Sequence, residues 1–278
     1  MRILLIGSRN VGKTTHMATC YGMMKKGVTL GRFRFFGNQM SFANNSELDW
    51  MAHACAVGNL PATAKLGSFS TTLLWRNHGA MRVTFSDSRG QMLAMPQASR
   101  EFRELRSAFM NSDCIMAYFR SEDIVSQDTF VKQIRTDSLA NLVDLMNERL
   151  RSGKRCVVII NITCCDLVSN QKALRAFITG FLKCDSGSML VAGNLMTCVP
   201  GRERNVLEPL ALCLYHGLCQ PPPFDAGVAE VRNRQKCRDA LRRYLEGKDM
   251  MTSQTRRETV ERRGIRDMLE GLIDRIHG

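Results

Sequence analysis

The stretch that decides the fold is RILLIGSRNVGKTT, residues 2–15 of a 278-residue chain. Residues 2–6 predict a buried strand, and residues 7–14 fit the pattern G-x-x-x-x-G-K-[ST] of a phosphate-binding loop. The two glycines let the backbone curl so that successive N–H groups point at a phosphate, and a helix to about residue 26 adds its positive dipole end. The sequence therefore predicts that a nucleoside triphosphate binds at this loop.

The residue types within the loop match the charges that a triphosphate brings. Lys13 reaches the β- and γ-phosphates, and Thr14 offers its hydroxyl to Mg²⁺. The residues that we expect around the phosphates are Gly7, Arg9, Asn10, Val11, Gly12, Lys13, Thr14 and Thr15.

Strands and helices alternate along the chain beyond the loop. Apolar runs predict strands at 68–77, 81–87, 114–119, 156–162 and 188–198, with a turn at 77–80. Helical periodicity predicts helices at 46–58, 99–112, 126–151, 170–182 and 205–217. The helix at 99–112 has Ser99 as its expected N-cap, and the expected buried stripe of the helix at 126–151 is Leu139, Leu142, Val143, Leu145 and Met146. This alternation predicts an α/β fold with a doubly wound sheet that binds ligands at the carboxyl ends of its strands.

The chain divides into three expected parts. Residues 1–218 form the nucleotide-binding domain, with a long and largely irregular insertion at 27–68. Three consecutive prolines mark residues 219–225 as a semi-rigid linker. Residues 226–278 form a basic appendage of two helices, about 226–246 and 255–277, for which a hairpin packed on the core is expected. The alternative is a dimerisation or docking surface for an acidic partner, since arginines flank the apolar stripe Ile265–Ile276.

Composition excludes several classes of protein. No run of eighteen apolar residues exists, so no membrane span is expected, and the apolar start is too short for a signal peptide. The eleven cysteines show no disulfide framework, which indicates reduced thiols and a cytoplasmic location. The net charge of +13 is spread along the chain without a Lys/Arg tract, so nucleic acid is not the expected main partner.

A second motif, DSRG, follows the strand predicted at 81–87. Asp87 ends this strand, where phosphate-loop enzymes need a carboxylate for Mg²⁺. The backbone N–H of Gly90 can meet the γ-phosphate, and the amide of Gln91 can orient an attacking water. The alternative interpretation is a solvated Asp-Gly turn.

A third motif, TCCD, follows the strand predicted at 156–162. It resembles the [NT]-K-x-D element that reads guanine, with Thr163 at the first position and Asp166 accepting the N1 and exocyclic amine hydrogens. Cys164 replaces the usual lysine and offers a smaller apolar cover for the base. Cys198 and Val199, one strand and one helix later, are expected against the base. The alternative is that Asp166 only caps the next helix.

With these three elements in order, residues 1–218 resemble the Ras-like branch of P-loop GTPases of the TRAFAC class. The resemblance implies a Ras-like mixed sheet, here followed by a C-terminal helical hairpin. Within that branch the chain is most similar to the large bacterial double-GTPase group, on the segments Gly58–Thr63 and Asp87–Gly90.

The resemblance also implies roles for three residues. Thr63 would be the switch I threonine that closes on Mg²⁺ and the γ-phosphate, with Thr71 and Thr72 as nearby rivals. Arg9 would either obstruct a partner's arginine or lie over the γ-phosphate, and Arg89 would supply transition-state charge in cis. For both arginines a solvent-facing position is the alternative.

These inferences favour a regulatory switch that binds GTP with Mg²⁺ and hydrolyses it slowly to GDP. Its switch segments, 58–67 and 87–98, would control an effector or regulatory protein, in a bacterial defence or signalling system, and the C-terminal helices would contact that partner or a second copy of the chain. Two alternatives remain, an ATP-using P-loop enzyme and a nucleotide-bound scaffold without hydrolysis. Cys213, His216 and Cys219 have metal-like spacing but no fourth ligand, so packing is expected for them.

Overall fold

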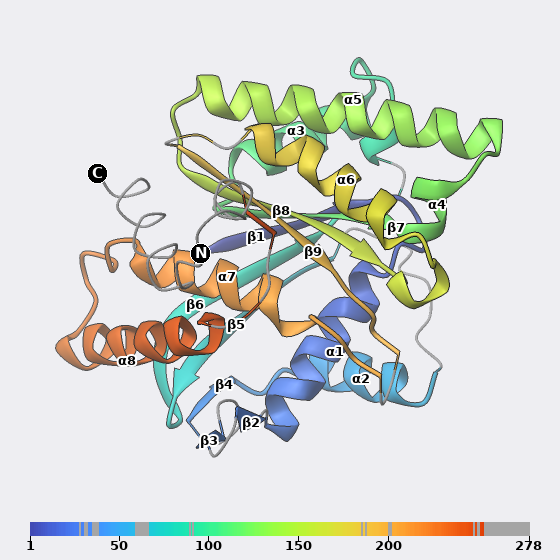
Figure 1. Ribbon diagram of the computed structural model, residues 1–278. Coiled ribbons are helices and arrows are strands. Elements are labelled where there is room, and N and C mark those ends of the chain that lie inside the picture. The colour runs from blue at the N-terminus through green and yellow to red at the C-terminus, as the bar shows by residue number, and fades with distance from the viewer. Residues whose placement is uncertain are drawn as a thin grey trace, which may run out of the picture.

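The computed structural model describes residues 1–27, 29–30, 33–34, 39–58, 67–88, 90, 92–184, 186, 188–199, 202–246, 248 and 251–252. An eight-stranded sheet in the order β10-β9-β8-β7-β1-β6-β5-β4 runs through the described part (Figure 1). Its strands are β1 (Arg2–Gly7), β4 (Met40–Phe42), β5 (Gly67–Trp75), β6 (His78–Asp87), β7 (Cys114–Arg120), β8 (Cys156–Thr163), β9 (Met189–Leu195) and β10 (Met251–Thr252). A separate two-stranded ribbon pairs β2 (Thr29–Leu30) with β3 (Phe33–Arg34).

The sheet is mixed. Strands β6, β1, β7, β8 and β9 are parallel, whereas β4, β5 and β10 pair antiparallel at the two edges. The predicted α/β class with a doubly wound mixed sheet is therefore confirmed.

Helices cover both faces of the sheet. Figure 1 shows α3 (Arg100–Met110), α5 (Thr129–Arg151) and α6 (Gln171–Phe181) above the sheet, with α1 (Lys13–Lys26), α7 (Leu207–Cys219) and α8 (Val228–Leu245) below it. Helix α2 (Ser46–Ala56) packs on α1, and the remaining short helices are η1 (Met92–Ala94), α4 (Ser121–Val125), η2 (Cys165–Leu167) and η3 (Leu182–Cys184).

Strand β1 contributes side chains to the hydrophobic cores on both faces of the sheet. Because side chains alternate along a strand, Ile3 and Leu5 enter the core below the sheet, while Leu4 and Ile6 enter the core above it. All four side chains are at most 1% exposed. Continuous apolar runs in β7 and β8 have the same cause, since both strands are covered on both faces.

Several predicted boundaries are confirmed and several are wrong. The Ser99 side chain accepts a hydrogen bond from the Phe102 N–H at 3.1 Å, as its N-cap role requires. The helix predicted at 126–151 starts at Thr129, because the Asp128 side chain caps it, and the separate helix α4 precedes it. Of its expected stripe, Leu142, Leu145 and Met146 are fully buried, whereas Leu139 and Val143 are partly exposed at the edge of the core.

The insertion at 27–68 holds more regular structure than its sequence predicts. Strand β4 pairs with β5 through Met40 and Trp75, although three residues are too few for a recognisable alternation. The predicted turn between β5 and β6 falls at Arg76 and Asn77, which have φ of 47° and 68°, so the tip is two left-handed residues. Residue His78 already belongs to β6.

The first helix of the expected appendage packs on the sheet and on α7. The Asn233 side chain donates to the Gly79 carbonyl at 3.1 Å, and Cys237, Leu241 and Tyr244 are buried in the core below the sheet. The second expected helix, at 255–277, lies outside the described residues, so the hairpin and the three-part division of the chain stay predictions. Among the described helices, no helix is long and apolar enough to span a membrane.

A buried polar chain ties α1 to β7 and to the start of α7. His16 is 0% exposed; its Nδ1 lies 2.6 Å from the Tyr118 hydroxyl and its Nε2 lies 2.6 Å from the Val206 carbonyl. Because a carbonyl only accepts, we assign the ring proton to Nε2, and the Tyr118 hydroxyl then donates to Nδ1. Burial lowers the pKa of His16 to about 4, and the bond to Val206 opposes this shift.

This burial predicts an acid-sensitive stability. In the unfolded chain a histidine takes up its proton near pH 6.5, whereas His16 in the folded chain stays neutral to about pH 4. Its contribution is therefore complete above pH 6.5 and is lost as the pH falls from 6.5 to 4. We expect the free energy of unfolding to drop by about 3 kcal/mol over this range from His16 alone.

Urea unfolding of the wild type and of His16→Gln across this pH range measures the effect. The substitution lowers stability at every pH but flattens the slope, whereas His78→Gln, at an exposed histidine, keeps the wild-type slope. An unchanged slope in His16→Gln would show that His16 is not the titrating group.

Candidate nucleotide-binding site

The phosphate loop leaves β1 through a glycine that no other residue can replace without strain. Gly7 has φ +148°, and a Cβ built on it lies 2.5 Å from the Tyr118 carbonyl oxygen. Asn10 and Gly12 also have positive φ, of 61° and 85°, so the chain turns sharply before α1 begins at Lys13. The loop stands at the carboxyl end of β1, between the parallel strands β7 and β6.

Lys13 lies across this loop. Its side chain is 7% exposed, and Nζ donates to the carbonyls of Gly7 and Ser8 at 3.1 Å each. Burial lowers the pKa of the ammonium, and the charge of Asp87 partly offsets this shift. A phosphate bound in the loop would take over these donors from the two carbonyls.

Asp87 ends β6 beside the first turn of α1. The Thr14 hydroxyl donates to its Oδ2 at 3.1 Å, while its Oδ1 is buried and has no hydrogen-bond partner among the described residues. Burial raises the pKa of the carboxyl, and Lys13 and the Thr14 bond oppose the shift. A buried carboxylate oxygen without a partner, next to a hydroxyl, is a set of hard oxygen donors that fits Mg²⁺ directly or through water.

Gly90 touches the phosphate loop. A Cβ built on it lies 2.5 Å from both the Cα and the N of Arg9, so only glycine allows this approach of the two backbones. Three other expected residues, Thr63, Arg89 and Gln91, lie outside the described residues, and their roles stay predictions. Thr71 and Thr72, the two alternatives to Thr63, both lie in β5. The Thr71 hydroxyl donates to the Ala43 carbonyl at 3.2 Å.

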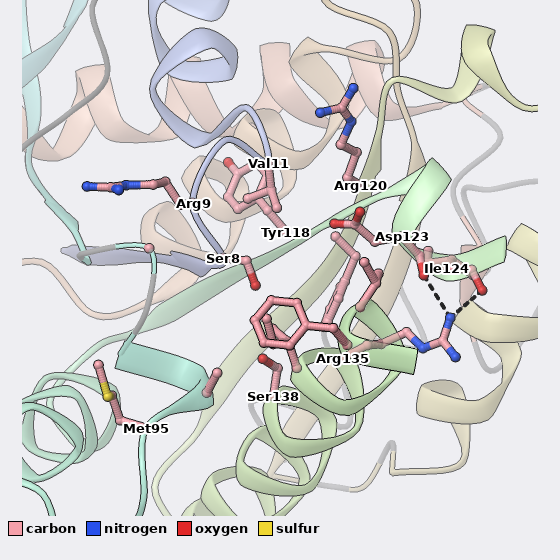
Figure 2. Close-up of a pocket in the computed structure, with 16 residues that line it drawn as sticks. Ser8, Arg9, Val11, Met95, Tyr118, Arg120, Asp123, Ile124, Arg135 and Ser138 are labelled. Atoms are coloured by element: carbon pink, nitrogen blue, oxygen red, sulfur yellow. Dashed lines mark hydrogen bonds between the residues drawn. The ribbon is translucent and has the colours of Figure 1, made fainter. Parts of the chain in front are cut away.

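The loop residues that sequence reasoning named differ in their surroundings. Val11 is buried, Thr15 is half-buried in the first turn of α1, and Arg9 and Asn10 are exposed. Figure 2 shows the Arg9 guanidinium pointing out from the loop, away from the neighbouring cavity.

The TCCD segment meets the loop at its first residue. The Thr163 hydroxyl donates to the Val11 carbonyl at 2.8 Å, which fixes the end of β8 against the phosphate loop. Cys164 then takes a left-handed conformation with φ 54°, and its carbonyl accepts the Ser121 hydroxyl at 2.6 Å. Asp166 follows on η2 with its carboxylate exposed.

Two residues that the sequence analysis did not name complete this corner. The Thr197 hydroxyl donates to Asp166 Oδ1 at 3.2 Å, and Leu167 is 57% exposed. Val199 is 43% exposed, while Cys198 is largely buried, which raises the pKa of its thiol to about 12. The Thr197 hydroxyl thus orients the Asp166 carboxylate. Exposed apolar side chains follow both residues closely in sequence, Leu167 after Asp166 and Val199 after Thr197. The sequence offered no signal for Thr197, because its role arises from a contact with Asp166, 31 residues earlier in the chain.

The metal-like CLYHGLC spacing belongs to the core. Cys213 and His216 are 0% and 4% exposed on α7. In the described part of the chain no three His, Cys, Asp or Glu side chains are grouped for a metal ion.

No family model and no curated protein matches this chain. Among solved structures, Era from Aquifex aeolicus bound to GDP and aluminium fluoride matches with 14% identity and a TM-score of 0.41, over 80% of this chain and 57% of that one. A bacterial selenocysteine-specific elongation factor matches with 14% identity and a TM-score of 0.39, over 77% and 28%. The Arl6 small GTPase from Trypanosoma brucei, with bound GppNp, matches with 13% identity and a TM-score of 0.38, over 77% and 94%.

These likenesses concern the fold. The chain spans a little over half of the Era chain and about a quarter of the elongation factor. The sheet order and the phosphate loop described above confirm the predicted doubly wound mixed sheet with a phosphate loop after its first strand, and the Ras-like assignment stays a prediction. The narrower likeness to the double-GTPase group stays a prediction. At these identities the function has to be inferred from the site's own residues.

The loop geometry predicts opposite effects for two alanine substitutions. Gly7→Ala places a methyl group against the Tyr118 carbonyl at a backbone conformation that alanine avoids, so we expect a loss of about 2 to 4 kcal/mol of stability. Gly180→Ala, inside α6 with no atom within 4 Å of the new methyl group, is the control and should gain about 0.5 to 1 kcal/mol. Chemical unfolding measures both; equal effects would contradict the assigned loop conformation.

Proposed function

We propose that this chain binds a guanine nucleoside triphosphate with Mg²⁺ and acts as a regulatory switch that hydrolyses it slowly to the diphosphate. The observation that carries the proposal is the contact of Thr14 with Asp87 beneath a phosphate loop that already holds its lysine. This contact joins the two oxygens that such sites use for Mg²⁺.

The phosphate half of the proposal rests on Lys13 and the loop backbone. Lys13 would leave the two loop carbonyls and pair with phosphate oxygens. The N–H groups of the loop and the N-terminus of α1 would stabilise the same anion. Mg²⁺, when bound, would supply positive charge that offsets the negative charge of the phosphates. Thr14 and Asp87 would hold it, with Thr63 as the expected further ligand.

The base half rests on Asp166. Its exposed carboxylate, held at one oxygen by Thr197, is an acceptor for a base that presents two N–H donors, as guanine does. Leu167 and Val199 are exposed apolar side chains that would cover the faces of a base. Cys164 and Cys198 would add small apolar surface in place of a lysine stem. Adenine lacks the donor pair, so the ATP-using alternative depends on the base being bound by other residues.

The switch part rests on the segment after Gly90. The Gly90 backbone lies against the Arg9 backbone. Met92 and Leu93, which follow it, insert into the core above the sheet. The Asn141 amide, on α5, donates to the carbonyls of Leu93 and Met95 at 2.9 Å and 3.0 Å. A displacement of Gly90 by a γ-phosphate would therefore reach α5, and a partner that contacts this face would sense it. Partner control, a role in bacterial defence or signalling, and contact through the C-terminal helices or a homodimer are parts of this proposal.

Titration of GTP, GDP and ATP against the purified chain, with and without Mg²⁺, tests the proposal. We expect GTP to bind more tightly than ATP, and GTP to lose affinity by about tenfold or more when Mg²⁺ is chelated. Asp87→Asn should remove most of the Mg²⁺ dependence, because the buried carboxylate no longer carries a charge. Tighter binding of ATP would contradict the guanine assignment.

Turnover separates the switch from a scaffold. Phosphate release from GTP by the wild type should exceed that by Gln91→Ala. Equal and negligible release by both proteins would favour the scaffold.

A substitution at Asp166 tests the residue that reads the base. Asp166→Asn presents an amide donor in place of one carboxylate acceptor, so the preference should move from guanine toward xanthine nucleotides. Competition binding of GDP and XDP to both proteins measures the change. Asp128→Asn, at the cap of α5, is the matched control that keeps guanine preference. An unchanged preference in Asp166→Asn would show that this residue does not contact the base.

A further inference from the structure

A cavity of about 510 Å³ opens on the other side of the phosphate loop, between the loop, η1 and the corner where α4 meets α5 (Figure 2). Its lining includes Ser8 and Gly90 but not Lys13, Asp87 or Asp166. The cavity therefore shares the residues Ser8, Arg9, Val11 and Gly90 with the nucleotide site, but not the side chains of Lys13, Asp87 or Asp166.

The cavity wall is mostly apolar. Ile124, Phe130, Val131 and Ile134 form the side made by α4 and α5, and Met95 lies opposite. Phe130 is 73% exposed on the first turn of α5, which is unusual for so large an apolar side chain. Space of this size, with aromatic and aliphatic walls, suits a small organic molecule.

One buried hydroxyl in this wall has no partner. Ser138 is 2% exposed, and its Oγ makes no hydrogen bond to any described residue. Figure 2 shows the Ser138 and Ser8 hydroxyls turned toward the interior of the cavity. A buried hydroxyl without a partner costs stability, so this position favours a ligand that carries a hydrogen-bonding group.

Among the described lining residues, Asp123 carries a negative charge and Arg9, Arg120 and Arg135 carry positive charges. The half-buried carboxylate of Asp123 is turned inward, whereas Arg9, Arg120 and Arg135 direct their guanidinium groups away (Figure 2). Arg120 pairs with Glu122, and Arg135 donates to the backbone carbonyls of Asp123 and Ile124 at 2.7 Å and 2.6 Å.

These arrangements leave the Asp123 carboxylate without a contacting cation. Within the described part of the chain, no Lys, Arg or His nitrogen lies within 4.0 Å, the limit for an ion pair, of a carboxylate oxygen of Asp123. Burial raises the pKa of this carboxyl, with the charges of Arg120 and Arg135 opposing the shift. A ligand cation would stabilise the ionised form, whereas a purely apolar ligand would leave it desolvated.

We propose that this cavity binds a small organic cation of the arylalkylamine class, with its ammonium on Asp123, its ring against Phe130 and Ile134, and a polar substituent at Ser138. An organic anion would meet the carboxylate of Asp123, and a simple hydrocarbon would satisfy neither polar group. The proposal does not depend on which nucleotide the phosphate loop binds.

Binding of three matched probes to the full chain tests the charge requirement on the unaltered protein. Tyramine has a ring, an ammonium and a hydroxyl; 4-ethylphenol lacks the ammonium; 3-(4-hydroxyphenyl)propionate carries a carboxylate instead. We expect saturable tyramine binding by ligand-observed NMR, with the other two about tenfold weaker or more. Equal binding of the three, or no saturable tyramine binding at millimolar concentrations, would overturn the proposal.

Variants then assign the contacts. Asp123→Asn should weaken tyramine about tenfold while leaving 4-ethylphenol unchanged, and Asp137→Asn, elsewhere on α5, should leave both unchanged. Ser138→Ala should weaken tyramine but not phenethylamine, which lacks the hydroxyl. Tyramine affinity that is unaffected by Asp123→Asn would place the amine elsewhere on the protein and refute the site.

Discussion

Tyr118 fixes both ends of the phosphate loop, and the rest of the site depends on this constraint. Its backbone lies against Gly7, where a Cβ would come within 2.5 Å of the carbonyl oxygen, so the loop must leave β1 at this point. Its hydroxyl lies 2.6 Å from His16 on α1, on the far side of the same loop. Tyr118 therefore contacts the start of the loop through its main chain, and it contacts the helix that follows the loop through its side chain. This leaves the loop little freedom, so the cost of ordering it is met during folding and not during phosphate binding.

Strands β6 and β8 bring their polar ends to this anchored loop, and the chain after β9 meets the segment that follows β8. β6 ends in Asp87 beside Thr14, β8 ends in Thr163 against Val11, and the chain after β9 brings Thr197 to Asp166. These residues come from distant parts of the sequence, and parallel pairing places them together because every carboxyl end lies at the same edge of the sheet. The interior of the strands supplies mostly apolar packing, and the polar groups named above lie at that edge.

The sequence predicted those parts of the site that local chemistry determines. GSRNVGKT, DSRG and TCCD each place a required residue type directly after an apolar strand, which is why Lys13, Asp87 and Thr163 could be named from the sequence alone. Thr197 and Asn141 could not be named, because their roles arise from contacts with residues 31 and 48 positions away. Strand β4 was not predicted for a related reason. Its three residues form a strand only because the edge of β5 is available for pairing. The early start of the long helix was a local error, since the cap at Asp128 competes with the apolar pattern before it.

The carboxylates around the loop show how a basic protein keeps sites for cations and donors. The chain has a net charge of +13, yet Asp87, Asp123 and Asp166 form no ion pair within the described residues. Thr14 and Thr197 hold two of them by hydroxyl groups, which orient a carboxylate without cancelling its charge. Arg120 and Arg135 lie near the third, Asp123, but their N–H groups contact Glu122 and backbone carbonyls instead. A salt bridge at any of these positions would already satisfy the carboxylate. Without one, Asp87, Asp166 and Asp123 keep the charge that the proposed metal ion, base and amine would need.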